Sequence, residues 1–164
     1  MRIIGIDPGS RITGVGVIDS DGQHNKHVFS TCIRVEKLSF PKRLGEIYIQ
    51  LQKIIEQYQP EQAAVEDVFL SNNPKSALKL GQARGAAICA CETNFVDVFE
   101  YSAREIKQSV VGKGNADKNQ INHMVKILLN LQGKIQSDTA DGLAIALSHA
   151  HRQTFKKRME AHQK

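Results

Sequence analysis

The chain has 164 residues, 41% of them hydrophobic, which suits one globular domain with an apolar core. Its Lys and Arg residues outnumber Asp and Glu by 22 to 17, and this modest excess favours a polyanionic partner without identifying one. The three cysteines form no CxxC pair, which argues against a disulfide scaffold and a zinc site. No run of about 20 apolar residues predicts a membrane span. We therefore expect a cytoplasmic protein.

The first 35 residues are rich in β-branched side chains. Residues 2–7 and 13–19 predict two strands of a hairpin, joined by a turn at residues 8–12, and residues 27–35 predict a third strand. Glycines in the hairpin permit a positive φ or a close approach of other backbone. We therefore expect a three-stranded antiparallel meander.

The middle of the chain alternates helices and strands. Apolar residues recur at spacings of three and four over residues 40–58, which predicts an amphipathic helix. Residues 63–68 predict a fourth strand, residues 74–92 a helix rich in small apolar side chains, and residues 95–101 a fifth strand. The small-residue helix is expected to pack closely against another surface.

Three helices close the predicted domain, at residues 102–110, 117–131 and 137–151. The polar, basic tail at residues 153–164 is expected to be flexible rather than packed, which leaves residues 1–152 as the domain. The order of these elements predicts an α/β domain with a mixed five-stranded sheet flanked by helices.

Four acidic residues occur where predicted elements begin or end. Asp7 ends the first strand, Glu66 lies near the end of the fourth, and Asp138 and Asp141 share the last helix. Residues three apart on a helix lie on one face, so the last two carboxylates can point at one spot. If the first and fourth strands are neighbours, all four carboxylates converge.

A cluster of carboxylates needs cations to stay ionised, and ligands that are all oxygen favour Mg²⁺, or Mn²⁺ as its substitute, over zinc. Two such ions can hydrolyse a phosphodiester, one by activating water and the other by stabilising the leaving oxygen. The spacing alone leaves an alternative open, because Asp7 before Pro8 can cap a turn and Asp138 can complement a helix dipole.

Five segments, in order along the chain, carry a resemblance to a known family. They read GIDPGSRITGVGVID at residues 5–19, AVEDVFL at 64–70, ALKLGQARG at 77–85, YSAREIKQSVVGKGNADKNQI at 101–121 and SDTADGLAIALSHA at 137–150. Together they resemble the motifs of the RuvC family of crossover junction endodeoxyribonucleases. Asp7, Glu66, Asp138 and Asp141 fall on the acidic tetrad of that family.

The resemblance implies an RNase H-like fold and the Mg²⁺-dependent resolution of four-way (Holliday) DNA junctions in recombination and repair. Its expected products are paired symmetric nicks with 5′-phosphate and 3′-hydroxyl ends, made by a two-metal mechanism. It also implies a homodimer built on the helix at residues 74–92, and the branch-migration proteins RuvA and RuvB as partners.

Basic residues extend the expected site. Lys107 and Lys118 match family lysines near the catalytic acids, where an ammonium can hold the scissile phosphate. Lys75, Lys79 and Arg84 lie on the small-residue helix and are candidates for contacts with the DNA backbone. An interface ion pair is the alternative for Arg84.

Three residues with aromatic rings have open roles. Phe69 follows Glu66 by three residues and is a candidate to stack on an unpaired base at the junction, or else folds back on the core. His149 and His151 lie on different faces of the last helix, which favours structural roles over a shared metal ion.

The last motif departs from the family pattern at two positions, where Thr139 and Gly142 replace more typical alanines. Glycine within a helix costs about 0.5–1 kcal/mol relative to alanine. Gly142 is therefore expected to weaken the helix beside Asp141.

Two other functions compete with the nuclease. A phosphotransferase with the actin-like fold shares the glycine-rich beginning, but it needs a second domain to enclose a nucleotide, which 164 residues do not accommodate. A junction-binding protein without catalysis is disfavoured because all four acids are present.

Overall fold

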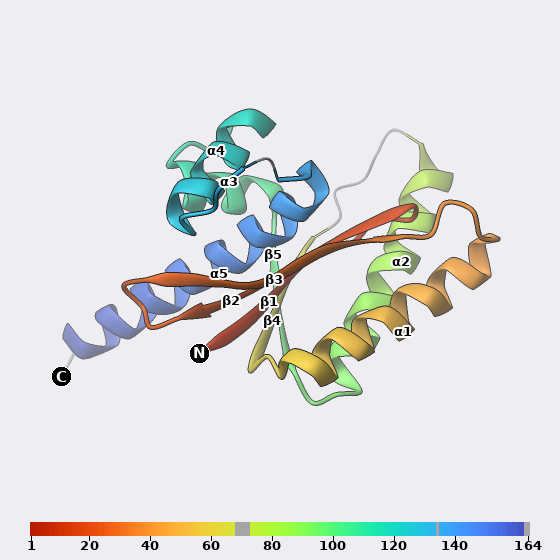
Figure 1. The fold of residues 1–164 in the computed structure, drawn as a ribbon, viewed down its shortest axis with the longest axis horizontal. Coiled ribbons are helices and arrows are strands. Elements are labelled where there is room, and N and C mark those ends of the chain that lie inside the picture. Colours follow the sequence, from red (N-terminus) through yellow and green to blue (C-terminus); the bar gives the residue numbers. More distant parts are fainter. Residues whose placement is uncertain (68–72, 134, 163–164) are drawn as a thin grey trace.

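The computed structural model describes residues 1–67, 73–133 and 135–162 (Figure 1). Within these ranges five strands form one sheet in the order β3-β2-β1-β4-β5. The strands β1 (Arg2–Asp7), β2 (Ile12–Ser20) and β3 (Asn25–Arg34) pair antiparallel, whereas β4 (Gln62–Glu66) pairs parallel with β1, and β5 (Asp97–Tyr101) with β4. The predicted meander and the predicted mixed sheet are confirmed.

Helices cover both faces of this sheet (Figure 1). One face carries α1 (Phe40–Tyr58) and α2 (Pro74–Glu92), whose bounds agree with the prediction, and the other carries α3 (Ala103–Val111), α4 (Lys118–Leu128) and α5 (Ser137–His162). No helix in the described part of the chain is long and apolar enough to cross a membrane.

Successive side chains of β1 point to opposite faces of the sheet, which divides the core into two layers and determines where Asp7 points. Ile4 and Ile6 pack with α1 and α2, whereas Ile3 packs with α5. All three are fully buried, and burial of such a side chain stabilises by about 1.5–3 kcal/mol. Asp7 has the same parity as Ile3 and therefore lies on the α5 face.

The last helix is longer than expected, because α5 continues past His151 to His162. The residues between are mostly strong helix formers such as Gln, Lys, Arg and Met. Thr154 approaches Gly22 in the β2–β3 turn, and Gln153 and Lys157 line a cleft with that turn. The extension is therefore helical, but residues 155–161 are exposed, which agrees with the expected lack of packing; its flexibility stays a prediction.

The fifth strand begins at Asp97, two residues later than predicted. Phe95 has a φ of 59° and a side chain that is 97% exposed, so it belongs to the turn after α2. The aromatic, β-favouring side chain was misleading here, because the chain must first reverse direction.

Candidate active site

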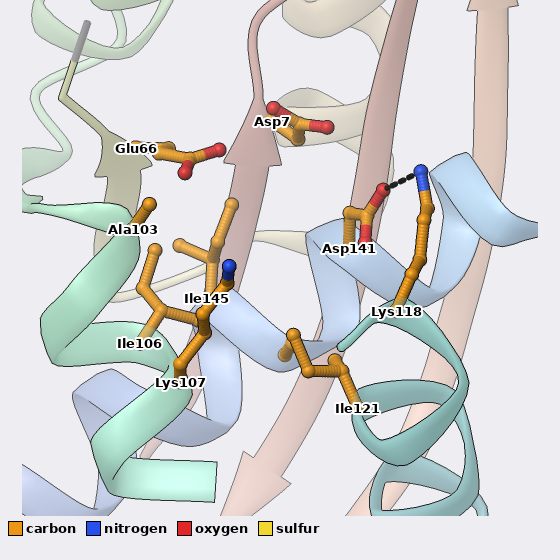
Figure 2. Close-up of a pocket in the computed structure, with 10 residues that line it drawn as sticks. Asp7, Glu66, Ala103, Ile106, Lys107, Lys118, Ile121, Asp141 and Ile145 are labelled. Atoms are coloured by element: carbon orange, nitrogen blue, oxygen red, sulfur yellow. Dashed lines mark ion pairs between the residues drawn. The ribbon is translucent and has the colours of Figure 1, made fainter. Parts of the chain in front are cut away.

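Asp7 and Glu66 end two neighbouring parallel strands. Ile6 of β1 pairs with Val65 of β4, which leaves the two acids side by side at the carboxyl ends. Figure 2 shows their carboxyl groups facing one another across the top of the cleft. The expected adjacency of the first and fourth strands is confirmed.

The two carboxyl groups are largely buried, and burial outweighs the nearby positive charges of Lys107 and Lys118. Burial, together with the charges of Glu66 and Asp141, raises the pKa of Asp7 to about 8, and burial also raises the pKa of Glu66. Two buried carboxyl groups that face each other favour one proton shared between them. A cation placed between them would remove the repulsion that keeps this proton bound.

A stripe of glycines brings α5 unusually close to the sheet. A Cβ atom at Gly5 would overlap the backbone of α5. One at Gly14 would overlap the carbonyl oxygen of Asp138, and one at Gly16 would lie 2.6 Å from the backbone of α5. None of these glycines has a positive φ, so close approach and not turn geometry explains them. The start of α5 is thereby held above Asp7.

Gly142 is the helical partner of this stripe. A Cβ atom there would lie 2.8 Å from the backbone nitrogen of Gly16 and 2.8 Å from the backbone carbon of Val15. The expectation that Gly142 simply weakens the helix is therefore incomplete, because alanine would push α5 away from β2. The glycine favours the packing that places Asp141.

Thr139, the second departure from the family pattern, ties the same helix to β3. Its Oγ1 atom lies 3.1 Å from the Sγ atom of Cys32, and the residue is only 8% exposed. An alanine cannot make this contact. Thr139 therefore adds a polar anchor beside Asp138, one that no single-sequence pattern reveals.

Two lysines supply positive charge opposite the acids. Lys118 at the start of α4 donates to Asp141 Oδ2 at 2.9 Å, and the bond raises the pKa of the ammonium. Burial raises the pKa of Asp141, while Lys118 opposes that shift. Lys107 extends from α3 into the space between Glu66 and Asp141 (Figure 2).

These side chains surround a cleft of about 250 Å³. Its apolar floor comes from three isoleucines on three helices, Ile106, Ile121 and Ile145. Asp138 is not among the residues that line it, although its charge acts on both Asp141 and Lys118. The structure thus brings three of the four predicted acids into one cleft and places the fourth beside it.

The donor set suits a divalent ion in atom type and in charge. All candidate ligands are carboxylate oxygens, and three carboxyl groups have raised pKa values that a cation would lower. Within the described ranges, however, no three His, Cys, Asp or Glu side chains are already grouped as metal ligands are. Lys118 instead holds Asp141, so this carboxylate would exchange one cation for another.

The candidate DNA contacts on α2 differ in their surroundings. Lys75 and Lys79 are exposed, with the Nζ atom of Lys79 5.4 Å from the ring centroid of Phe40. Arg84 forms ion pairs with Glu100 and Asp67. Phe69 lies outside the described residues.

Arg84 also supports the end of β4. Its Nε atom donates to the backbone oxygen of Glu66 at 3.2 Å, and its side chain is 17% exposed. The ion pairs of Arg84 lie within the chain, so the interface ion pair stays a prediction. A contact with DNA stays a prediction.

His149 has the structural role that its spacing predicted. It is fully buried, with Nδ1 2.7 Å from the Tyr101 hydroxyl and Nε2 2.8 Å from Gln62 Oε1. Burial lowers its pKa to about 4, so the ring is neutral near pH 7. The network joins α5 to β4 and β5, whereas His151 turns instead to Ser109.

Comparison with known proteins places this site in a family. Residues 3–149 match the family described as "Crossover junction endodeoxyribonuclease RuvC". A protein so described from Dichelobacter nodosus is 57% identical over 150 residues, which cover 92% of this chain and 85% of that protein. Another from Alkalilimnicola ehrlichii is 51% identical over 158 residues, which cover 96% of each.

Solved structures agree with the sequence match. The structure described as "T. thermophilus RuvC in complex with Holliday junction substrate" matches with a TM-score of 0.89 at 31% identity, over 95% of this chain and 96% of that one. The yeast mitochondrial Holliday junction resolvase Ydc2 shares the fold, with a TM-score of 0.69 at 13% identity. The match covers 98% of this chain and 85% of that one. The chain, with its RNase H-like sheet and acidic cleft, belongs to the RuvC family of crossover junction endodeoxyribonucleases.

Proposed function

We propose that this chain is an endonuclease that resolves four-way DNA junctions by paired symmetric nicks in homologous recombination and repair. The observation that carries the proposal is the convergence of Asp7, Glu66 and Asp141 from three elements on one cleft, in a chain of the RuvC family. The Thermus thermophilus relative, whose structure is described with a Holliday junction substrate, supports the choice of DNA.

A nuclease of this family uses a divalent metal ion. We propose Mg²⁺, two ions for each site, with Mn²⁺ as a substitute. Asp7 would bridge the ions, Glu66 would hold one, and Asp138 with Asp141 would hold the other. When bound, such ions supply activation of water and stabilisation of the leaving 3′-oxygen.

The side chains around the metal ligands have their own tasks. Lys107 extends into the cleft and would hold the scissile phosphate, while Lys118 would move from Asp141 to the DNA once that carboxylate holds an ion. The three isoleucines make the floor of the cleft apolar, which would strengthen ionic contacts formed against it. Hydrolysis would leave a 5′-phosphate and a 3′-hydroxyl.

Paired nicks require two sites at a fixed separation, and we propose a homodimer built on α2. Its outward side carries Leu78, 68% exposed, and Gly81 and Gly85, which have open space where a Cβ atom would lie. Such a face lets a second backbone approach closely. RuvA and RuvB are the proposed partners in a cytoplasmic complex.

A junction-cleavage experiment tests the proposed function. Synthetic four-way junctions of several core sequences, each strand labelled in turn, are incubated with the chain with and without Mg²⁺. We expect symmetric nicks in opposed strands only with Mg²⁺. Binding without nicks would favour the non-catalytic alternative, and hydrolysis of a nucleotide without nicking would favour the phosphotransferase.

Phe69 offers a separate test on the DNA side. Replacing Phe69 by Ala would weaken distortion of the junction, measured by fluorescence of 2-aminopurine at the crossover, more than it weakens binding of Mn²⁺. Equal losses in both would exclude base stacking as the role of this ring.

A further inference from the structure

A second cleft continues the active-site cleft on the side away from Lys118. It measures about 560 Å³ and shares Asp7, Glu66, Ala103 and Lys107 with the first. Its remaining lining includes Pro8, Leu80, Arg104 and Gly114. Because the two clefts share four residues, they form one groove with the carboxylates at its middle.

Arg104 is the arginine at the outer end of this groove. It lies three residues before Lys107 on α3, so the two side chains share one side of the helix. Arg104 is exposed and has no hydrogen-bond or ion-pair partner among the residues that the structure describes. By contrast, the guanidinium of Arg84 is held by Glu100 and Asp67.

Gly114, in the loop between α3 and α4, lies against the stem of Arg104. A Cβ atom at Gly114 would lie 2.9 Å from Cγ and 3.3 Å from Nε of Arg104. The φ of Gly114 is not positive, so space and not backbone conformation is what the glycine provides. A side chain here would displace the flexible arginine before it disturbed the fold.

We propose that Arg104, with its stem packed on Gly114, binds a backbone phosphate of the DNA strand next to the scissile phosphate. This inference rests on the proposed nuclease function. The middle of the groove is acidic and depends on metal ions, so flanking phosphates need a separate cation. A guanidinium that no carboxylate occupies presents its planar donors to two phosphate oxygens.

The experiment measures junction binding by fluorescence anisotropy over a range of salt concentrations, without divalent ions, so that no cleavage occurs. Replacing Arg104 by Ala is expected to weaken binding about tenfold, as loss of a charged hydrogen bond does. It should also reduce the slope of log K against log salt by about 1, equally for different junction sequences. The matched control is Lys53→Ala, which removes an exposed charge from α1 and should change neither.

Gly114→Ala separates position from charge, because it displaces Arg104 and leaves the net charge unchanged. We expect affinity to fall with an unaltered thermal midpoint, and the double variant with Arg104→Ala to bind no more weakly than Arg104→Ala alone. This inference would be overturned if the losses of affinity in the double variant were additive. It would also be overturned if the slope of log K against log salt were the same for Arg104→Ala and Lys53→Ala. Either result would leave the nuclease function intact. Failure of the unaltered chain to bind any junction would overturn both.

Discussion

The two strand acids and the two helix acids are positioned at or beside one cleft by different physical means. Asp7 and Glu66 are placed by backbone pairing, since β1 and β4 are hydrogen-bonded neighbours whose carboxyl ends coincide. Asp138 and Asp141 are placed by packing, because α5 lies directly on a glycine stripe. Strand pairing tolerates changes in side chains, whereas a packed helix start shifts with a single added methyl group.

The two pairs also differ in electrostatics. Asp7 and Glu66 face each other, whereas Asp141 is held by Lys118. Burial thus opposes ionisation of the strand pair, whereas a direct ion pair with Lys118 offsets part of the effect of burial at Asp141. We expect substitutions in the strand pair to act on chemistry and those around the helix to act on position.

The largest effect is expected from Asp7→Asn. The amide cannot bridge metal ions, so junction cleavage should fall by more than about 100-fold. Because burial disfavours the charged carboxylate, the same change should raise the thermal midpoint of the metal-free protein. Asp97→Asn, an exposed acid at the start of β5, should change neither quantity. Near-normal cleavage by Asp7→Asn would exclude the proposed mechanism.

Acidity should weaken metal binding by up to about tenfold per pH unit below the pKa of Asp7, about 8. A proton on Asp7 must leave before an ion binds, so affinity for Mn²⁺, measured by calorimetry, should rise with pH and level off above that value. Without metal, the stability of the fold changes with pH in the opposite direction to metal affinity. The folded pKa exceeds the ordinary value of 3.8, so this group's stabilisation is present at low pH and is lost as pH rises towards 8. A flat affinity profile would contradict this assignment.

Gly142→Ala should reverse the usual effect of replacing glycine in a helix. Intrinsic propensity favours alanine by about 1 kcal/mol, but overpacking against β2 costs about 1–3 kcal/mol. We expect a net loss in the free energy of unfolding, measured with urea, together with weaker Mn²⁺ binding. The control is Gly45→Ala in α1, where nothing lies within 4 Å and alanine should stabilise. Equal stabilisation by both variants would show that α5 does not need the close approach.

The smallest effect is expected at Thr139. Valine keeps the shape but loses the contact with Cys32, which should cost about 1 kcal/mol, while serine should preserve it. Combining Thr139→Val with Cys32→Ala tests the pair, because the double variant should lose less than the sum of the single ones. Strict additivity in unfolding experiments would show that the two side chains are not coupled.

The difference between strand and helix also decided what the sequence could predict. Asp7 and Glu66 follow β-rich runs, so their places at strand ends were predictable from local pattern, and α1 and α2 from apolar spacing and proline. The contact of Thr139 with Cys32 spans 107 residues, and no local pattern encodes it. Gly142 was misjudged for the same reason, since helix propensity says nothing about a strand on the other side.

The continuation of α5 beyond His151 was missed by the sequence pattern for a different reason. Its residues lose the apolar spacing that marks a buried helix, although their individual propensities favour helix. Thr154 lies against the β2–β3 turn, whereas residues 155–161 are exposed. Polar composition was therefore a poor guide to secondary structure at this end of the chain.

The most direct test of the account is to locate bound metal in crystals of the protein soaked with Mn²⁺, using anomalous scattering. Strand and helix acids are claimed to form a single site, so we expect density in contact with Asp7 and with at least one of Asp138 and Asp141, and displacement of Lys118 from Asp141. Manganese bound by Asp7 and Glu66 alone, with the Lys118 ion pair intact at saturating metal, would contradict the claim.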